Sequence, residues 1–361
     1  MKKSALIIIG FILLGCGLLV GITLWRSVPA VNRQIMILLT PEPHFFEELY
    51  LINADGTNQI QLTNNLMTEV RYSWSPDGQQ IVFAGSHQFS KYQIFVLNMK
   101  DRRLLNLTQN LEAGDRSPTW APDSKQIAYV SDQDGNLEIY RINADGTERT
   151  RLTYTAEKDE NPVWSPDGRR LAFTSTRDGN REIYVMNVDG SQQTRLTYNN
   201  VDRDWQPAWS PDGKRLAFAS DRDGDVEIYV MNIDGSQQTN ITNAPRTWEK
   251  QPRWSPDGQL VGFRADRFAE DAIYVADASG QERLSLHDYP AFRAAPVWSP
   301  DGKQIAIEVI ENIDIAHIHL INVDGTGEIR LNLTQVPYAV GPVWSPDGKQ
   351  LLFSGDPADK D

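Results

Sequence analysis

Residues 161–190 read NPVWSPDGRRLAFTSTRDGNREIYVMNVDG, and residues 206–235 read QPAWSPDGKRLAFASDRDGDVEIYVMNIDG. The tryptophan of this stretch recurs at intervals of 44 to 46 residues, as Trp74, Trp120, Trp164, Trp209, Trp254, Trp298 and Trp344. A fixed period of this length indicates a repeat architecture, in which each unit packs against its neighbours. The chain from about residue 35 onward is therefore organised by a single repeated unit.

Each unit contains short runs of residues that favour β-strands. Leu171–Phe173 and Ile183–Met186 are examples, and Gly, Pro and Asp bound the runs. Runs of this kind predict four strands in each unit. A four-stranded antiparallel unit of about 45 residues is typical of a β-propeller blade. The sequence therefore predicts an all-β fold, a seven-bladed β-propeller.

The Ser-Pro-Asp-Gly segment of the repeat has the residue order of a tight turn. Pro166 presets its own φ, Asp167 suits the next position, and Gly168 accepts a positive φ. We therefore expect a structural role and no catalytic one for the aspartates at this position, Asp77, Asp123, Asp167, Asp212, Asp257, Asp301 and Asp347. The tryptophan before each turn is expected to pack as a large side chain between blades.

The two ends of the repeat region are incomplete units. Leu49–Ile52 and 58–63 have the pattern of third and fourth strands, whereas Pro342–Ser354 supplies a tryptophan strand and the strand after it. We expect one blade to be built from both ends, because closing the ring removes exposed sheet edges. Two segments compete for the second strand of that blade, Ile35–Thr40 and Gln350–Ser354, and the sequence leaves the choice open.

The N-terminus carries an uncharged apolar run of 21 residues, Ala5–Trp25, preceded by Lys2 and Lys3. As a helix it would be about 31 Å long, close to the thickness of a bilayer's hydrocarbon core. This pattern predicts a membrane helix in residues 1–30, with the propeller of residues 31–361 on the extracytoplasmic side of a bacterial membrane. A lipoprotein attached through Cys16 and a cleaved signal peptide are alternatives. All three place the propeller outside the cytoplasm.

The charge balance restricts the class of partner. The chain has a formal net charge of −13. Beyond residue 30 there are 32 basic and 48 acidic residues, a difference of −16. Nucleic-acid binding needs clustered Lys and Arg, so this balance disfavours it. A protein or peptide partner is expected, and the charge favours a basic one.

Acidic residues precede most of the repeat tryptophans by five positions. They are Glu69, Asp115, Asp159, Asp204 and Glu249, and the series is interrupted by Arg293 and Ala339. If the tryptophan strand is innermost, these carboxylates surround one mouth of the central channel, where they would bind Ca²⁺ or a basic peptide. The alternative is that each carboxylate caps its own loop.

Aromatic residues accompany the acidic positions. The connections that lead to the same mouth contain Tyr154, Tyr198, Trp205, Trp248 and Tyr338. Exposed aromatic side chains on loops are common recognition groups. We therefore predict that they contribute to a binding surface.

The sequence offers little catalytic chemistry. It has no GxSxG nucleophile elbow, and the repeats leave no room for a hydrolase domain. His317 and His319 lie two residues apart, on one face of an expected strand, but no third metal ligand accompanies them. No catalytic residue is predicted.

The motif order WSPDG, LAF, IYVMN and DGS…LT resembles the WD40-like propeller repeat of TolB, which also occurs in tricorn-type and prolyl-oligopeptidase-type peptidases. The resemblance covers about residues 35–354. It implies a non-catalytic scaffold for proteins or peptides, and alternatively an accessory propeller of a peptidase or a polysaccharide-active lyase. TolB has an α/β domain before its propeller and is described with six blades. Neither feature matches here, so an orthologue of TolB is not expected.

Overall fold

The computed structural model describes residues 10–13, 18–21, 47–65, 67–87, 90–199, 202–244, 246–267, 270–280, 283–289, 295–311, 315–334 and 336–356. Contacts divide the chain into two units, Met1–His44 and Phe45–Asp361. Each unit is considered by itself.

Two short segments of the first unit, within the region of the expected membrane helix, belong to the described residues. They form two antiparallel strands, β1 (Gly10–Leu13) and β2 (Leu18–Gly21). Glycine lowers helix propensity, and Ile12 and Val20 are β-branched residues that favour strands. Within the described ranges, no helix is long and apolar enough to cross a membrane. Cys16 and the remainder of residues 1–30 lie outside those ranges.

The second unit consists of short strands. Its first two sheets contain β5 (Met67–Trp74), β6 (Gln80–His87), β7 (Gln93–Asn98) and β8 (Leu104–Asn106), then β9 (Asp115–Trp120), β10 (Gln126–Ser131), β11 (Glu138–Asn143) and β12 (Thr150–Arg151). The next two contain β13 (Asp159–Trp164), β14 (Arg170–Ser175), β15 (Glu182–Asn187) and β16 (Thr194–Arg195), then β17 (Asp204–Trp209), β18 (Arg215–Ser220), β19 (Glu227–Asn232) and β20 (Thr239–Asn240). A fifth contains β21 (Trp248–Trp254), β22 (Leu260–Arg267), β23 (Glu270–Asp277) and β24 (Arg283–Tyr289).

The remaining strands form one eight-stranded sheet. They are β25 (Val297–Trp298), β26 (Gln304–Ile310), β27 (Ala316–Asn322), β28 (Ile329–Arg330), β29 (Tyr338–Trp344), β30 (Gln350–Asp356), β3 (Glu48–Asn53) and β4 (Ile60–Gln61). A single parallel pairing, between Ala316 and Tyr338, joins its two halves. Each half otherwise has the four antiparallel strands of the other sheets.

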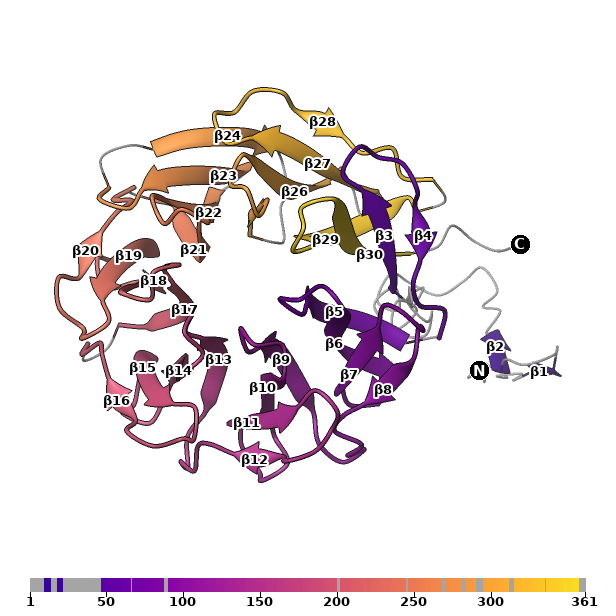
Figure 1. Ribbon diagram of the computed structural model, residues 1–361, viewed down its shortest axis with the longest axis horizontal. Coiled ribbons are helices and arrows are strands. Elements are labelled where there is room, and N and C mark those ends of the chain that lie inside the picture. Colours follow the sequence, from indigo (N-terminus) through magenta and orange to yellow (C-terminus); the bar gives the residue numbers. More distant parts are fainter. Residues whose placement is uncertain are drawn as a thin grey trace, which may run out of the picture. The chain divides into compact units, whose positions relative to one another are not determined.

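The sheets of this unit surround a common axis, with β5, β9, β13, β17 and β21 nearest to it (Figure 1). The prediction of an all-β fold made of four-stranded sheets is confirmed. The structure also resolves which strand completes the sheet made from both ends. Strand β30 lies between β29 and β3, with Phe353 opposite Tyr50, so 350–354 takes the second position. The competing segment Ile35–Thr40 lies outside the described residues.

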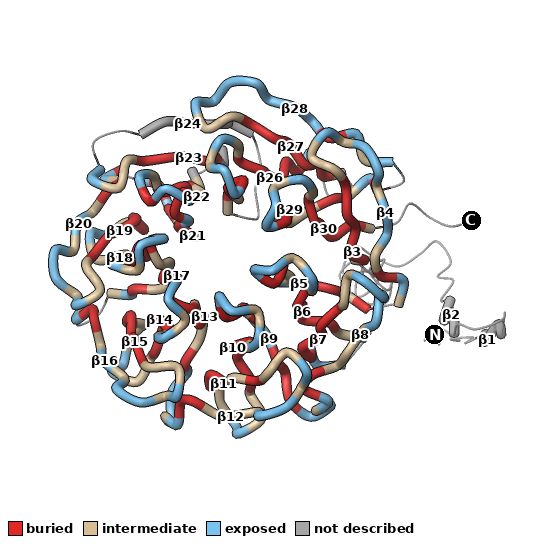
Figure 2. Tube along the Cα trace, viewed as in Figure 1, coloured by how far each residue is buried: buried red, intermediate tan, exposed pale blue. Residues whose placement is uncertain are grey.

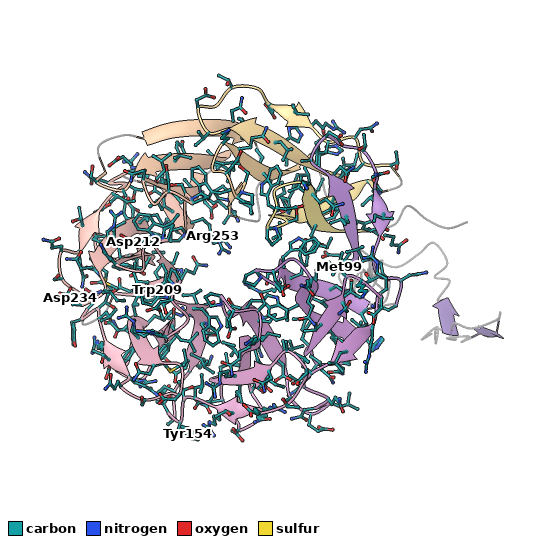
Figure 3. The ribbon with its side chains drawn as sticks, in the orientation of Figure 1. Met99, Tyr154, Trp209, Asp212, Asp234 and Arg253 are labelled. Carbon is teal, nitrogen blue, oxygen red and sulfur yellow. The ribbon has the colours of Figure 1, made fainter. Side chains whose placement is uncertain are left out.

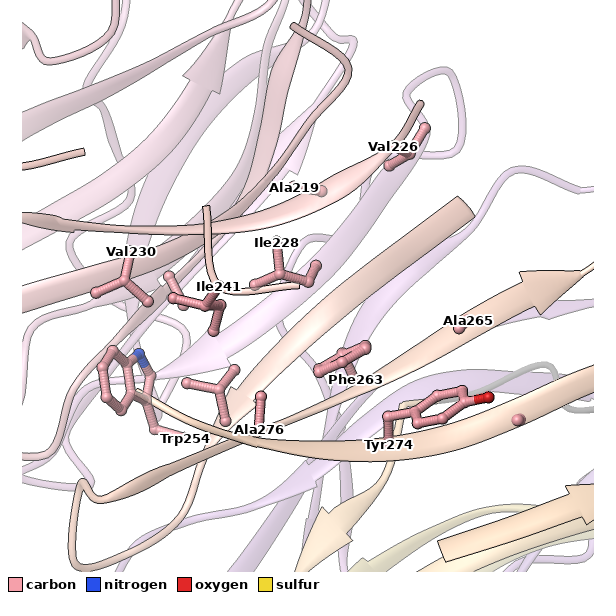
Figure 4. Close-up of a cluster of buried hydrophobic side chains, with 13 residues drawn as sticks. Ala219, Val226, Ile228, Val230, Ile241, Trp254, Phe263, Ala265, Tyr274 and Ala276 are labelled. Atoms are coloured by element: carbon pink, nitrogen blue, oxygen red, sulfur yellow. The ribbon is translucent and has the colours of Figure 1, made fainter. Parts of the chain in front are cut away.

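The cores of this unit lie between neighbouring sheets, because each sheet buries both faces. Figure 2 shows buried backbone through the middle of the sheets and exposed turns at their ends. The cluster in Figure 4 packs Trp254, Phe263 and Tyr274 of one sheet against Ile228 and Val230 of the sheet before it. Burial of apolar surface on this scale is the main stabilising contribution to the fold.

The repeat tryptophans also tie consecutive sheets together by hydrogen bonds. Trp164 Nε1 donates to the carbonyl of Thr119 at 3.1 Å, and Trp209 Nε1 donates to that of Val163 at the same distance. Trp120, Trp254, Trp298 and Trp344 make the equivalent bond to the preceding sheet. Trp74 differs, since its Nε1 is buried without a partner among the described residues.

This difference predicts that replacing tryptophan by phenylalanine destabilises the protein more at Trp164 than at Trp74. We expect Trp164→Phe to lower the free energy of unfolding by about 1 kcal/mol more than Trp74→Phe, because only Trp164 loses an intersheet hydrogen bond. Urea denaturation of both variants, followed by tryptophan fluorescence and circular dichroism, measures the difference. Equal losses would show that the indole hydrogen bond contributes nothing to holding the sheets together.

The aspartates of the Ser-Pro-Asp-Gly segments have the contacts of turn residues. Asp167 accepts hydrogen bonds from the Ser165 hydroxyl at 2.6 Å and the Arg169 amide at 3.1 Å, and these bonds lower its pKa. The equivalent aspartates Asp77, Asp212, Asp257, Asp301 and Asp347 make the same pair of contacts. In the repeat of Asp123, Ala121 stands in place of the serine, so Asp123 accepts only the hydrogen bond from the Lys125 backbone amide. These contacts give the aspartates a role in the turn.

Candidate functional site

The five acidic residues of the predicted ring lie at the start of the innermost strands. Asp115, Asp159 and Asp204 are the first residues of β9, β13 and β17, and Glu69 and Glu249 lie near the start of β5 and β21. All five side chains are fully buried, at 0% exposure. They are therefore surrounded by other protein groups.

Two of these carboxylates form buried ion pairs within their own sheets. Asp159 pairs with Arg177 at 2.9 Å, and Asp204 pairs with Arg222 at 2.9 Å. Each arginine comes from the loop after the second strand, 18 residues beyond its partner in both cases. Arg222 also donates to Gln238 and stacks on the ring of Tyr229 at 4.5 Å. These arginines neutralise the acid and fix the loop.

The other three carboxylates have different neighbours. Glu69 accepts hydrogen bonds from the Thr63 hydroxyl, the Asn65 amide and the Leu49 backbone N–H, at 2.5, 2.7 and 3.1 Å. Glu249 accepts from the Thr247 hydroxyl at 3.1 Å. Burial raises the pKa of Asp115, although nearby hydroxyls partly offset this. The prediction of a ligand-binding ring thus remains a prediction, and these contacts are those of acids that cap loops.

A second set of buried acids, which the sequence analysis did not single out, stands at the start of the third strands. Glu182 accepts hydrogen bonds from the Thr197 hydroxyl at 2.5 Å and from the backbone N–H of Asn199 at 2.9 Å. It also forms an ion pair with Arg195 at 2.7 Å. Glu138 and Glu227 occupy the same position in adjacent sheets. The recurring pair Glu-Ile before Tyr was the signal in the sequence, and it was read only as a strand.

The arginine of this set supports an exposed tyrosine. Arg195 stacks on the ring of Tyr198 at 4.7 Å, and the Tyr198 hydroxyl donates to the carbonyl of Arg195. Arg151 and Tyr154 repeat the arrangement, at 4.6 Å. The two tyrosine residues are 69% and 71% exposed. Each of two neighbouring sheets therefore contains the same three side chains in contact: a fully buried glutamate, a half-buried arginine and an exposed tyrosine.

The predicted aromatic residues do not gather in one place. Tyr154 and Tyr198 follow the outermost strands β12 and β16, and Figure 3 shows Tyr154 at the outer rim of the unit. Trp205 and Tyr338 are partly buried members of the innermost strands, whereas Trp248 is 56% exposed at the start of β21. The connection from a fourth strand to the next first strand runs from rim to axis, which separates the two groups.

Two of the buried glutamates, Glu69 and Glu227, have pKa values above the usual range of a carboxyl group. Burial raises the pKa of Glu69 to about 7. Burial and the nearby Glu249 together raise the pKa of Glu227 to about 7. Both groups therefore change charge in the physiological range.

The histidines predicted to share a strand face are bound to protein groups. His319 Nδ1 lies 2.5 Å from Glu328, and His317 Nε2 lies 2.6 Å from Arg330. Burial and the Arg330 charge lower the pKa of His317. Across the described ranges, no group of three or more His, Cys, Asp or Glu side chains is arranged to hold a metal ion.

The sheet order, the axial arrangement and the repeated turn define a β-propeller repeat protein. The model of the TolB beta propeller domain matches residues 158–267, 202–288 and 251–360. These overlapping matches cover more than half of the chain, which therefore belongs to this family.

Among curated relatives, the chain is similar to a TolB homolog of Chlorobaculum tepidum, with 32% identity over 107 residues, 30% of this chain and 24% of that protein. The chain thus matches about a quarter of that relative's length.

Solved structures share the fold at low identity. An oligogalacturonate lyase of Vibrio parahaemolyticus matches with a TM-score of 0.66 and 15% identity, over 86% of this chain and 96% of that one. A Mycobacterium tuberculosis puromycin-hydrolyzing peptidase matches with a TM-score of 0.62 and 15% identity, over 78% and 48%. At these identities the matches are evidence for the fold alone.

Proposed function

We propose that this protein is a seven-bladed propeller scaffold that binds a protein or peptide and is held at the outer side of a bacterial membrane by its N-terminal segment. Each of the five four-stranded sheets is one blade, and the two halves of the eight-stranded sheet are the other two. The apolar run Ala5–Trp25 supports the tether.

The observation that carries the binding role is the pair of exposed, supported tyrosines. Tyr154 and Tyr198 occupy equivalent positions in adjacent sheets, and each is stacked on an arginine that a buried glutamate holds. Rigid aromatic side chains lose little conformational entropy on binding, and they are frequent interface anchors. Family membership supports the same conclusion.

A catalytic role is the second candidate, since a lyase and a peptidase share the fold. A role as the accessory propeller of a hydrolase fits a sequence that contains no GxSxG nucleophile elbow. A hydrolase gene that lacks its own propeller, next to the gene for this chain, would favour that role.

The binding role is tested by affinity capture of the full chain from cross-linked membranes of its own host. We expect a partner to co-purify with the wild-type chain and its yield to fall at least about tenfold for Tyr154→Ala/Tyr198→Ala, because two interface anchors are lost. Ile329→Ala is the control, since Ile329 is also exposed, at 55%, but lies on β28. Wild-type yield from the double variant would exclude the tyrosines as the binding surface.

A further inference from the structure

Two arginines depart from the repeat at positions near the axis. Three residues before the repeat tryptophans stand Arg71, Ser117, Asn161, Gln206, Gln251, Ala295 and Gly341, and one residue before them stand Ser73, Thr119, Val163, Ala208, Arg253, Val297 and Val343. Arg71 and Arg253 are the only charged residues in these two series. Their presence is not explained by the needs of the repeat.

Arg71 shares its left-handed backbone conformation with the equivalent residues of other repeats, among them Ser117, Asn161 and Gln206. Strand β5 has a register irregularity between Val70 and Ser73, and Arg71 within it has a φ of 53°. Left-handed backbone is disfavoured for residues other than glycine, asparagine and aspartate. The bulge redirects this side chain away from the pairing pattern of the strand. Arg71 is exposed, and its guanidinium has no partner among the described residues.

Arg71 lines a pocket of about 430 Å³ between the sheets β5–β8 and β9–β12. The other charged lining residues are Lys91, Arg116 and Asp132. Asp132 accepts from the Gly114 amide at 2.7 Å, and it lies 3.4 Å from both Lys91 and Arg116. One carboxylate thus faces three cations, which leaves the pocket positive in a chain whose net charge is strongly negative.

The second departure, Arg253, lies on another sheet. It belongs to β21, and Figure 3 shows it on the side of its sheet that faces the axis. The side chain is exposed, and no ion pair of Arg253 occurs in the part of the chain that the structure describes. Desolvation by neighbouring groups and the charge of Arg71 lower the pKa of Arg253.

We propose that Arg71, Lys91 and Arg116 form a binding site for an oxyanion group, a carboxylate or a phosphate, on a ligand that enters the pocket between these two sheets. Guanidinium groups present several N–H donors in one plane and bind such groups through paired hydrogen bonds. This site is separate from the rim tyrosines and does not depend on the proposed scaffold function.

The test uses the full chain in detergent, with inorganic phosphate and citrate as probes and sodium chloride at matched ionic strength as the reference. We expect phosphate or citrate to raise the melting temperature saturably, since a ligand that binds only the folded state stabilises it. Arg71→Gln is expected to weaken the apparent affinity at least tenfold. The stronger probe identifies the group as phosphate or carboxylate.

Arg169→Gln is the matched control, because Arg169 is exposed on a Ser-Pro-Asp-Gly turn and its loss changes the net charge equally. Lys91→Gln provides a second variant if Arg71→Gln fails to fold, since Lys91 is 51% exposed. The proposal is overturned if neither anion shifts the melting temperature beyond the chloride reference. It is equally overturned if Arg169→Gln weakens binding as much as Arg71→Gln or Lys91→Gln.

Discussion

Arg222→Met is expected to lower the free energy of unfolding by about 3 kcal/mol, because it leaves a buried carboxylate without its counter-charge. Asp204 is 0% exposed, and the two guanidinium contacts to its oxygens are 2.9 and 3.0 Å long. Methionine fills a similar volume, so the loss reports the unpaired charge more than a cavity. Urea denaturation at pH 7, followed by circular dichroism, measures it.

The double variant Asp204→Asn/Arg222→Met separates charge from packing. It removes the uncompensated carboxylate, and we expect it to recover at least half of the lost stability. Arg181→Met is the control, since Arg181 lies 3.8 Å from Glu160 and both side chains are partly exposed. Exposed pairs contribute about 0–1 kcal/mol. A similar loss for Arg181→Met and Arg222→Met would mean that burial of Asp204 does not set the cost.

The repeat made the fold predictable from sequence. The Ser-Pro-Asp-Gly turns and the strand runs are local signals that recur along the chain, the turn sequence six times and once as Ala-Pro-Asp-Ser. The strand order within a sheet therefore followed from them. The choice between Ile35–Thr40 and Gln350–Ser354 was different, because both segments suit a second strand. Only the pairing of β30 with both β29 and β3 decided it.

The site was harder to predict because burial is a property of the assembled sheets. The sequence predicted that Asp159 and Asp204 belong to a ligand-binding ring, with loop capping as the alternative. The pattern shows a carboxylate but does not show that an arginine 18 residues later neutralises it. Tyr154 and Tyr198 were predicted to belong to a binding surface at the channel mouth. They lie at the outer rim instead, because they follow the outermost strands β12 and β16, a placement that the sequence does not show. Arg71 and Arg253 were overlooked, although comparing equivalent repeat positions would have found both.

The stability of the protein is expected to fall as the pH rises from 5.5 to 8. The pKa of Glu69 and that of Glu227 are raised from 4.5 to about 7 in the folded state, mainly by burial. A raised pKa means that the folded state binds the proton more tightly than the unfolded state. The stabilisation is therefore complete below about pH 4.5 and is lost as the pH rises through about 7. Between pH 5.5 and 8 the loss is about 2 kcal/mol for each group. The lowered pKa of His317 acts in the opposite direction and reduces the net effect.

Glu227→Gln tests this assignment within one carboxyl group. In the native chain the Ala244 backbone amide and the Thr242 hydroxyl donate to different oxygens of Glu227. Glutamine keeps one oxygen to accept from the Ala244 amide, and its NH2 group can donate to the Thr242 hydroxyl, but it cannot ionise. We expect melting curves of the variant to vary less between pH 5.5 and 8 than those of the wild type, by about 2 kcal/mol. Asp212→Asn is the control, because hydrogen bonds lower the pKa of Asp212 and its titration affects stability only in acid. If the pH dependence of Glu227→Gln equals that of the wild type, Glu227 does not change its protonation state between pH 5.5 and 8. Another titratable group would then cause the pH dependence of stability.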